Sequence, residues 1–307
     1  GLVVAVSGKA FSKAIAATVS DDIEVAVLED AVNGRRSTAL SSLWETKATT
    51  AVDAAHAKVG PDTIAKLLFT SGSTGSPKGV INTQRMLTSN QVMIETSYPS
   101  IGEGPPVLVD WLPWSHTFGA NHNVGIALMH GGTFYIDDGK PLPGGIEETV
   151  RNLREVAPTV YYNVPKGYEM LMPFLRAEPK LRETFFSRLQ FLFYAGASLP
   201  RHVRSELEEM ALATRGVAVP MITSLGSTET APSALNVTAK AAGPGVVGIP
   251  NAGVELKLVP TAGKLEARLK GPLITPGYWR QSDLTNTMFD PEGFYLLGDA
   301  LKFADPD

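Results

Sequence analysis

The chain has 307 residues, 44% of them hydrophobic, which allows one large buried core and a second, smaller unit. Lys and Arg total 27 against 31 Asp and Glu, so the net charge is −4 and a nucleic-acid partner is not expected. The absence of cysteine excludes disulfides, thiolate metal sites and a cysteine nucleophile, and no apolar run approaches the roughly 20 residues of a membrane helix.

The chain starts with an apolar stretch at Gly1 that lacks the basic flank and the cleavage pattern of a signal peptide. We therefore expect a chain entered midway and a cytoplasmic protein.

Short apolar runs alternate with amphipathic segments over about the first 240 residues, which is typical of parallel strands joined by crossover helices. Most of the runs are too uniformly apolar for half-exposed strands, so we predict buried parallel strands and an α/β fold. The predicted strands are residues 25–28, 66–69, 107–111, 133–136, 159–162, 191–194 and 221–224.

Apolar spacing predicts two helices between these strands. The apolar positions are Ile146, Val150 and Leu153 in the first helix, and Val203, Leu207, Met210 and Ala211 in the second, which Pro200 can open.

The composition changes after Ala242. Residues 243–253 are rich in Gly and Pro, and strand-like runs follow at 254–259 and 265–269. We therefore predict an α/β domain at 1–245, incomplete at its N-terminal end, and a smaller β-rich subdomain at 246–307.

The segment directly after the predicted strand 66–69 carries the strongest chemical signal. Residues 70–79 contain five hydroxyls, three glycines and one lysine. Glycines let backbone N–H groups turn toward one point, hydroxyls add donors, and lysine supplies positive charge, so the segment is suited to a polyphosphate. It is not the P-loop of kinases, because Lys78 follows Pro77 and precedes Gly79. A Gly/Ser linker has a similar composition, but a linker rarely follows a buried strand directly and ends in Pro-Lys-Gly.

Residues 70–79 resemble the phosphate-binding loop of the adenylate-forming superfamily, which includes acyl- and aryl-CoA ligases, luciferases and peptide-synthetase adenylation domains. Further family motifs follow in the family's order at 113–119, 195–199, 223–230 and 277–279 with 293–299. The resemblance is densest over residues 64–303. It implies the superfamily's N-terminal domain, with doubly wound, mostly parallel sheets and a smaller β-rich subdomain.

The resemblance implies that the chain binds ATP and Mg²⁺. Thr228 would contact the α-phosphate, Glu229 would carry Mg²⁺, and Asp299 would accept hydrogen bonds from the ribose hydroxyls. The β- and γ-phosphates would be held by Thr70, Ser71, Gly72, Ser73, Thr74, Gly75 and Lys78. The adenine side would be formed by Gly196, Ala197, Ser198, Leu225, Gly226 and Ser227, with Leu225 where the family usually has an aromatic residue.

The resemblance also implies an acyl slot beside His116, which in the family moves with the acyl group. A lone His among aromatic residues is more often a core residue, and here the other motifs favour the functional interpretation. The slot residues are His116, Phe118, Val164, Tyr168, Ala195 and Gly226. Small residues on one wall suit a flat aromatic acid such as a hydroxycinnamate, and residues 109–119, 162–169 and 256–260 look most like feruloyl-CoA synthetases.

The implied reaction forms acyl-AMP from an acid and ATP, then a thioester with coenzyme A, with Lys78, His116, Thr228 and Glu229 as the catalytic residues. A homodimer stays open, and neither nucleic acid nor a membrane span is expected. Four alternatives share the motifs: a fatty acyl-CoA ligase, a luciferase-like oxygenase, a peptide-synthetase adenylation domain and a non-catalytic nucleotide-binding fragment. The peptide-synthetase domain normally selects the amino group with an acyl-pocket aspartate, for which the sequence offers no clear candidate.

The family's small C-terminal lid carries a lysine that reaches the acyl-phosphate and should follow soon after Asp299. Lys302 is the only lysine after Asp299 and lies too close to that residue to serve in this role. We also expect further strands of the sheet before Gly1. We therefore expect a truncated chain, without the lid, that adenylates poorly or not at all.

Overall fold

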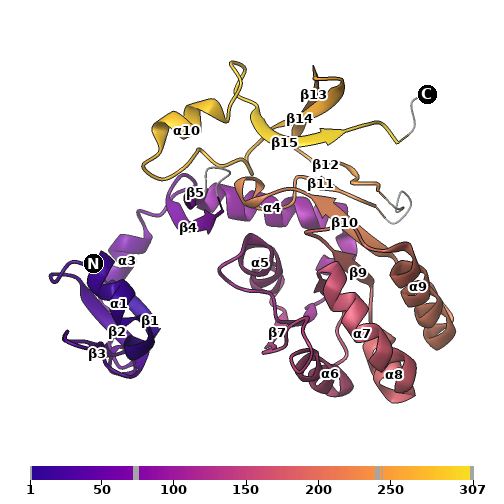
Figure 1. The fold of residues 1–307 in the computed structure, drawn as a ribbon, viewed down its shortest axis with the longest axis horizontal. Helices are drawn as coiled ribbons and strands as arrows, with labels where there is room; N and C mark the ends of the chain where they lie inside the picture. The colour runs from indigo at the N-terminus through magenta and orange to yellow at the C-terminus, as the bar shows by residue number, and fades with distance from the viewer. Residues whose placement is uncertain (1, 72–75, 239–242, 244, 305–307) are drawn as a thin grey trace. The chain divides into compact units, whose positions relative to one another are not determined.

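The computed structural model describes residues 2–71, 76–238, 243 and 245–304. The chain divides into two compact units, Gly1–Val59 and Gly60–Asp307 (Figure 1). Within the described residues, no helix combines the length and the apolar character that a bilayer crossing requires.

The unit Gly1–Val59 is built on a parallel three-stranded sheet in the order β1-β2-β3. Val25 and Val27 on β2 pack with Ile15 of α1 in a small core. The predicted strand 25–28 lies within β2, whereas the other elements of this unit were not predicted. The elements are β1 (Leu2–Ser7), α1 (Gly8–Thr18), β2 (Glu24–Glu29), β3 (Thr38–Ala39), α2 (Leu40–Trp44) and α3 (Thr50–His56).

The unit Gly60–Asp307 contains a five-stranded sheet in the order β12-β11-β10-β9-β8. Strands β8 to β10 are parallel to one another, and β11 and β12 continue the sheet in antiparallel fashion. A parallel pair, β6 and β7, adjoins β8 where the Thr159 N–H donates to Val107 O at 3.0 Å. The strands are β6 (Val107–Asp110), β7 (Thr133–Ile136), β8 (Val160–Asn163), β9 (Phe191–Tyr194), β10 (Met221–Leu225), β11 (Leu235–Asn236) and β12 (Ile249–Pro250).

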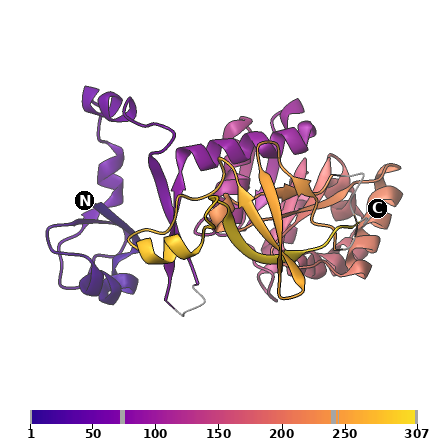
Figure 2. The ribbon, with the colours of Figure 1, turned by 90° about the horizontal axis from the view of Figure 1, so that it is seen from above.

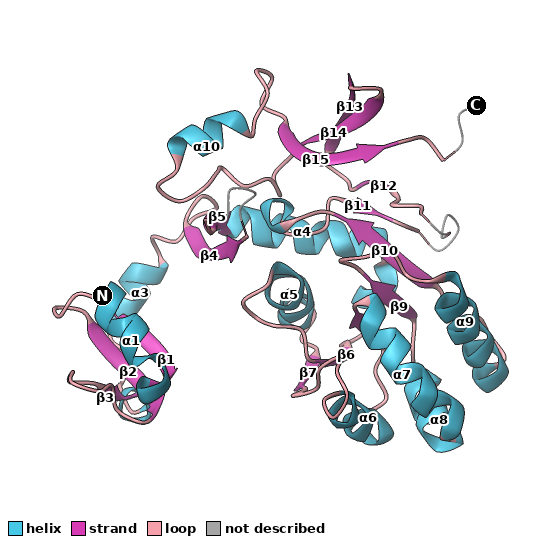
Figure 3. Cartoon of the chain, in the orientation of Figure 1, coloured by secondary structure: helices cyan, strands magenta, loops and turns pink. Residues whose placement is uncertain are grey.

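Both faces of the parallel strands are covered, because successive side chains of a strand point to opposite faces. Tyr161 and Leu192 pack into one core, whereas their neighbours Tyr162 and Phe193 pack into another. The helices contributing to the first core are α6 (Ile146–Glu155), α7 (Pro165–Ala177), α8 (Pro179–Phe186) and α9 (Arg201–Arg215), and they lie together in Figure 3. The second core is closed by α4 (Gln84–Ser97), the 3₁₀ helix η1 (Pro99–Glu103), the π-helix η2 (Phe118–Asn123) and α5 (Val124–Met129).

This arrangement confirms the predicted doubly wound α/β fold. The two predicted helices are α6 and α9, and their predicted apolar faces are buried except for the partly buried Met210.

The predicted strand 66–69 departs from the expected buried parallel type. It lies in β4 (Ile64–Thr70), which pairs antiparallel with β5 (Lys78–Thr83), and the two strands run side by side in Figure 2. The Phe69 side chain is 67% exposed. The expectation was wrong because β5, which the sequence pattern did not reveal, turns back directly onto β4 and gives it an antiparallel partner.

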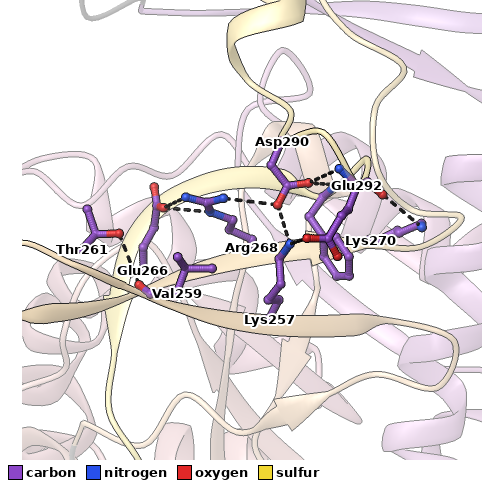
Figure 4. A network of polar contacts seen from close by, with 9 residues as sticks. Lys257, Val259, Thr261, Glu266, Arg268, Lys270, Asp290 and Glu292 are labelled. Atoms are coloured by element: carbon purple, nitrogen blue, oxygen red, sulfur yellow. Dashed lines mark hydrogen bonds and ion pairs between the residues drawn. The ribbon is translucent and has the colours of Figure 1, made fainter.

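The last sheet is antiparallel in the order β13-β14-β15. Its strands are β13 (Glu255–Thr261), β14 (Lys264–Lys270) and β15 (Tyr295–Leu301), with α10 (Ser282–Thr287) before β15. Asp290 Oδ2 forms ion pairs with Lys257 Nζ at 2.6 Å and with Arg268 Nη1 at 3.2 Å. Figure 4 shows this network. The predicted runs 254–259 and 265–269 fall largely in β13 and β14, whereas the domain boundary at residue 246 stays a prediction.

Candidate functional site

A cavity of about 1250 Å³ lies at the carboxyl ends of the parallel strands. Trp111 follows β6, Val164 follows β8, Ala195 follows β9 and Gly226 follows β10, and all four residues line the cavity. Ligands of open α/β sheets bind outside these strand ends, where loops from several strands converge. The cavity is therefore placed where a substrate site is expected.

Most of the predicted site residues line this cavity, although they come from separate parts of the sequence. The predicted nucleotide residues in the lining are Thr70, Ser71, Lys78, Gly196, Ala197, Ser198, Leu225, Gly226, Ser227, Thr228, Glu229 and Asp299. The predicted acyl residues in the lining are His116, Phe118, Val164, Ala195 and Gly226. The predictions for Gly72, Ser73, Thr74 and Gly75 lie outside the described residues.

Tyr168 does not line the cavity, so its assignment to the acyl slot needs correction. It lies on α7, fully buried in the core on the opposite face of the sheet. Its hydroxyl lies 2.9 Å from Phe193 O and 3.1 Å from Tyr161 O, within donating distance of both carbonyls. Carbonyl groups of β8 and β9 bind the Tyr168 hydroxyl on the face of the sheet away from the cavity, so the phenol is not available to a substrate.

Lys78 and Glu229 meet in the cavity as an ion pair. Lys78 Nζ lies 3.0 Å from Glu229 Oε1, and the two side chains are 19% and 6% exposed. Tyr278 completes a triangle, since Lys78 Nζ donates to its hydroxyl at 2.9 Å and the hydroxyl donates to Glu229 Oε1 at 2.9 Å. The Lys78 ammonium also lies 4.5 Å from the centre of the Tyr278 ring. The arrangement holds a cation and an anion side by side in a largely buried place.

The pKa of Glu229 reflects two opposing influences. Burial alone would raise it, but the hydrogen bond and the charge of Lys78, together with the Tyr278 hydroxyl, outweigh burial and hold the pKa below its ordinary value. Glu229 is therefore ionised near neutral pH.

Backbone contacts fix the loop that carries Glu229. The Thr275 N–H donates to Glu229 O at 2.8 Å, and the Ser227 N–H donates to Thr230 Oγ1 at 2.8 Å. Gly226 has no room for a side chain, because an added Cβ would lie 1.7 Å from Pro232 O. A glycine at this position lets the loop pass close to the neighbouring backbone.

The segment that carries Tyr278 pairs with β5. The Ile81 N–H donates to Gly277 O at 3.1 Å, and the Trp279 N–H donates to Gly79 O at 2.8 Å. These bonds place Tyr278 beside Lys78, the first residue of β5. Later in the chain, Asp299 on β15 lines the cavity and is exposed.

His116 is held as a hydrogen-bond acceptor at one ring nitrogen. The Phe118 N–H donates to His116 Nδ1 at 3.1 Å, and burial lowers the pKa of the ring. A neutral imidazole that accepts at Nδ1 carries its proton on Nε2. His116 therefore offers an N–H group at Nε2 as a hydrogen-bond donor.

Sequence reasoning gave no role to several residues of the site, among them Tyr278, Trp111 and His122. Tyr278 stands in the matched motif 277–279, and Trp111 ends a predicted strand, so each had a sequence signal for its place but none for its contacts. His122 follows the matched motif 113–119 and reaches the cavity because a π-helix spans Phe118–Asn123. Apolar periodicity does not reveal a π-helix.

A magnesium ion fits this site only together with phosphate oxygens. The described residues contain no group of three His, Cys, Asp or Glu side chains that could hold a metal by themselves. Mg²⁺ is commonly held by one or two carboxylates, with waters and substrate phosphates completing its octahedron. A single ionised carboxylate at Glu229, facing a cavity of this size, matches that chemistry.

The family described as AMP-binding enzyme matches residues 3–279. A feruloyl-CoA synthase of an Amycolatopsis species is 29% identical over 255 residues, covering 78% of this chain and 47% of the relative. An anthranilate–CoA ligase of Pseudomonas aeruginosa is 29% identical over 244 residues, covering 77% and 44%. The chain thus spans about half the length of the curated relatives it matches.

Solved structures share the fold over nearly the whole chain. ATP-bound MatB from Rhodopseudomonas palustris superposes with a TM-score of 0.73 at 25% identity, covering 97% of this chain and 56% of that one. A malonyl-CoA ligase with methylmalonyl-CoA and AMP bound gives a TM-score of 0.67 at 26% identity, covering 95% and 61%.

Proposed function

The chain belongs to the family of AMP-binding enzymes, and we propose that the protein activates an aromatic carboxylic acid with ATP and transfers it to coenzyme A. The observation that carries the proposal is the convergence of Lys78, Glu229 and Asp299 on one cavity from three distant segments. Their chemistry suits a triphosphate, a magnesium ion and a ribose, in that order. The likeness to CoA ligases supports the reaction class.

In the first half-reaction, a carboxylate oxygen of the acid attacks the α-phosphorus of ATP. The bond from that phosphorus to the oxygen bridging to the β-phosphate breaks, which gives acyl-AMP and pyrophosphate. Both reactants are anions, so the site must neutralise charge and hold them in line. Lys78 would serve the β- and γ-phosphates, Thr228 would serve the α-phosphate, and Glu229 would hold Mg²⁺, which would neutralise phosphate charge.

In the second half-reaction, the sulfur of coenzyme A attacks the acyl carbon. The thiol proton passes to solvent water, the bond from the acyl carbon to the AMP oxygen breaks, and a thioester and AMP result. His116 lies beside the acyl group and presents its Nε2 proton to an oxygen of the intermediate. Negative charge develops on the acyl oxygen as the sulfur attacks, and a hydrogen-bond donor directed at that oxygen stabilises it.

The cavity lining supports an aromatic acid as the substrate. Phe118, Val164 and Phe193 supply apolar surface, and the small side chain of Ala195 leaves space for a flat ring. Among the described lining residues, the only carboxylates are Glu229 and Asp299, which the nucleotide engages. This lining offers no carboxylate for the amino group of an amino acid, which disfavours a peptide-synthetase substrate. A hydroxycinnamate such as ferulate is the acid that we propose.

Pyrophosphate release from the full-length protein tests this function. We expect release with ATP, Mg²⁺ and a cinnamic acid, with slower release from benzoic and fatty acids, and a thioester once coenzyme A is added. Lys78→Ala and Glu229→Ala should each lower the rate about a hundredfold, because each removes a group that acts on developing charge.

The matched control is Lys166→Ala, whose lysine forms an exposed ion pair with Glu169 and does not line the cavity. It should retain the wild-type rate. Wild-type rates from both cavity variants would overturn the assignment of Lys78 and Glu229. Light without a thioester would indicate a luciferase-like oxygenase, and ATP binding without pyrophosphate release would indicate a non-catalytic nucleotide-binding protein.

A further inference from the structure

His122 lines the cavity and has a buried ring nitrogen for which the described residues supply no hydrogen-bond partner. The residue is 1% exposed and lines the cavity together with Phe118 and Phe193. Its Nδ1 lies 2.8 Å from Asn123 Oδ1, whereas its Nε2 is buried and has no hydrogen-bond partner among the described residues. A buried polar atom without a partner destabilises a fold, so such an atom beside a cavity points to a ligand that supplies the missing bond.

A hydrogen-bond chain fixes which ring nitrogen carries the proton. Asn123 Nδ2 donates to Asp110 Oδ2 at 2.9 Å, so the amide oxygen of Asn123 faces His122. His122 Nδ1 must then be the donor in that contact. Burial lowers the pKa of His122 to about 4, so the ring is neutral near pH 7. The remaining nitrogen, Nε2, is therefore a hydrogen-bond acceptor.

The surroundings hold this ring in place. Its centroid lies 5.1 Å from that of Tyr162 and 5.2 Å from that of Phe193. Gln91 Nε2 donates to His122 O at 3.3 Å and to Asn121 O at 2.7 Å, which satisfies carbonyls of the π-helix. The acceptor is thus held on a regular element and does not depend on a loose loop.

A second residue of the cavity lining, Trp111, has a buried hydrogen-bond donor. Trp111 Nε1 is buried, and none of the described residues accepts its N–H group. Trp111 lines the cavity, as His122 does. The lining residues thus include one acceptor and one donor without a partner among the described residues, and a hydroxyl group can donate to an acceptor such as His122 Nε2.

We propose that His122 Nε2 accepts a hydrogen bond from a hydroxyl group on the ring of the acyl substrate. His122 is then a specificity-determining residue that favours phenolic acids over acids without a ring donor, and Asp110 and Asn123 are positioning residues that set its tautomer. The inference rests on the proposed function, since it needs an aromatic acid in the cavity.

The test compares three acids that differ only at the ring position farthest from the carboxylate. These are 4-hydroxycinnamate, 4-methoxycinnamate, which has no donor, and cinnamate. The measurement is kcat/KM for pyrophosphate release by the full-length protein. The wild type should favour 4-hydroxycinnamate over 4-methoxycinnamate and cinnamate by about tenfold or more.

His122→Leu removes the acceptor and should bring these ratios close to one. The ratio is the readout, because any general loss of activity affects all three acids alike. His122→Gln, whose amide oxygen can replace Nε2, should retain a preference for the hydroxyl. The control is His130→Leu, because His130 Nε2 is also buried without a partner among the described residues but does not line the cavity. This variant should keep the wild-type ratios.

Asp110→Asn provides a second test that leaves the His122 ring in place. An amide at position 110 can donate to Asn123, which reverses the Asn123 amide and moves the His122 proton to Nε2. The preference for 4-hydroxycinnamate over 4-methoxycinnamate should then fall several-fold. This variant decides the question if His122→Leu does not fold.

Two failures can be told apart. Equal kcat/KM for the three acids in the wild type, or unchanged ratios in His122→Leu or Asp110→Asn, would overturn the role of His122 and leave the proposed function standing. No pyrophosphate release with any acid would overturn the proposed function itself.

Discussion

Replacing Lys78 with Met should destabilise the fold by about 3 kcal/mol, because it leaves the Glu229 carboxylate buried without its cation. The lost contact joins Lys78 Nζ to Glu229 Oε1 at 3.0 Å, and Glu229 is only 6% exposed at its side chain. The Tyr278 hydroxyl still donates to the carboxylate at 2.9 Å. Because this bond remains, we expect a loss at the lower end of the range of about 3–5 kcal/mol that follows the removal of one partner from a buried ion pair.

A matched surface pair isolates the contribution of burial. Lys166 Nζ also lies 3.0 Å from a glutamate oxygen, that of Glu169, but these side chains are 63% and 33% exposed. Lys166→Met should therefore change the free energy of unfolding by no more than about 0.5 kcal/mol. Urea denaturation of the full-length protein measures both variants. Glu229→Gln in the Lys78→Met background should restore most of the loss, because it removes the unpaired charge.

The pH dependence gives an independent check of the same reasoning. In the wild type the pKa of Glu229 is lowered, so its charge adds stability above the ordinary glutamate pKa of about 4.3, and this contribution is lost as the pH falls. Without Lys78, burial dominates and should raise the pKa of Glu229. The stability deficit of Lys78→Met should therefore shrink between pH 7 and pH 4. An equal deficit at both pH values, or one no larger than that of Lys166→Met, would refute the argument.

Three further substitutions test the structure elsewhere. Gly226→Ala should destabilise the protein by about 2 kcal/mol or more in urea denaturation, because its Cβ would lie 1.7 Å from Pro232 O, a backbone atom that has no easy way to move. Tyr168→Phe should lower the free energy of unfolding by about 1 kcal/mol and leave the KM for the acid unchanged, since the hydroxyl bonds backbone carbonyls in the core; a changed KM would return this residue to the acyl slot. Asp290→Asn should lower the urea midpoint at pH 7 and lower it less at pH 2, because Lys257 holds the pKa of Asp290 well below its ordinary value, so the contribution of the carboxylate declines only as the pH falls below the ordinary aspartate pKa of about 3.9; equal losses at both pH values would argue against it.

The sequence predicted the parallel strands of the unit Gly60–Asp307 well because their signal is local, whereas it missed the parallel strands β1 and β3 of the other unit. In β8 and β9 every residue is buried, so an uninterrupted apolar run and a strand coincide. β5 has no such run, since Lys78 and Asn82 interrupt it, and it forms because β4 and the segment at Gly277 supply partners for its backbone. Pairing with distant segments leaves no periodic trace in the strand itself.

The cavity residues were predicted from motifs, whereas their contacts were not. A motif marks Tyr278 as a position, but nothing in the sequence indicates that its hydroxyl joins Lys78 to Glu229. Tyr168 is a case in which the position itself misleads. Its place three residues after Pro165 does not indicate whether its side chain on α7 faces the acyl slot or the core on the other face of the sheet. The side of a short helix that faces a cavity depends on which core the strands beneath it present, and that is a property of the whole sheet.

The closed triangle at Lys78 bears on how the proposed site meets its nucleotide. Lys78 has three N–H donors, and Glu229 and Tyr278 already engage it, so the pair adds no net charge to the cavity. A lysine that is neutralised by a neighbouring carboxylate attracts a triphosphate less than a lone lysine does. In the proposed function, Glu229 would hold a divalent cation, and Lys78 would then be available to the phosphates. The same side chains that stabilise one another before binding would then each acquire a partner of opposite charge, so neither charge is left buried alone at any stage.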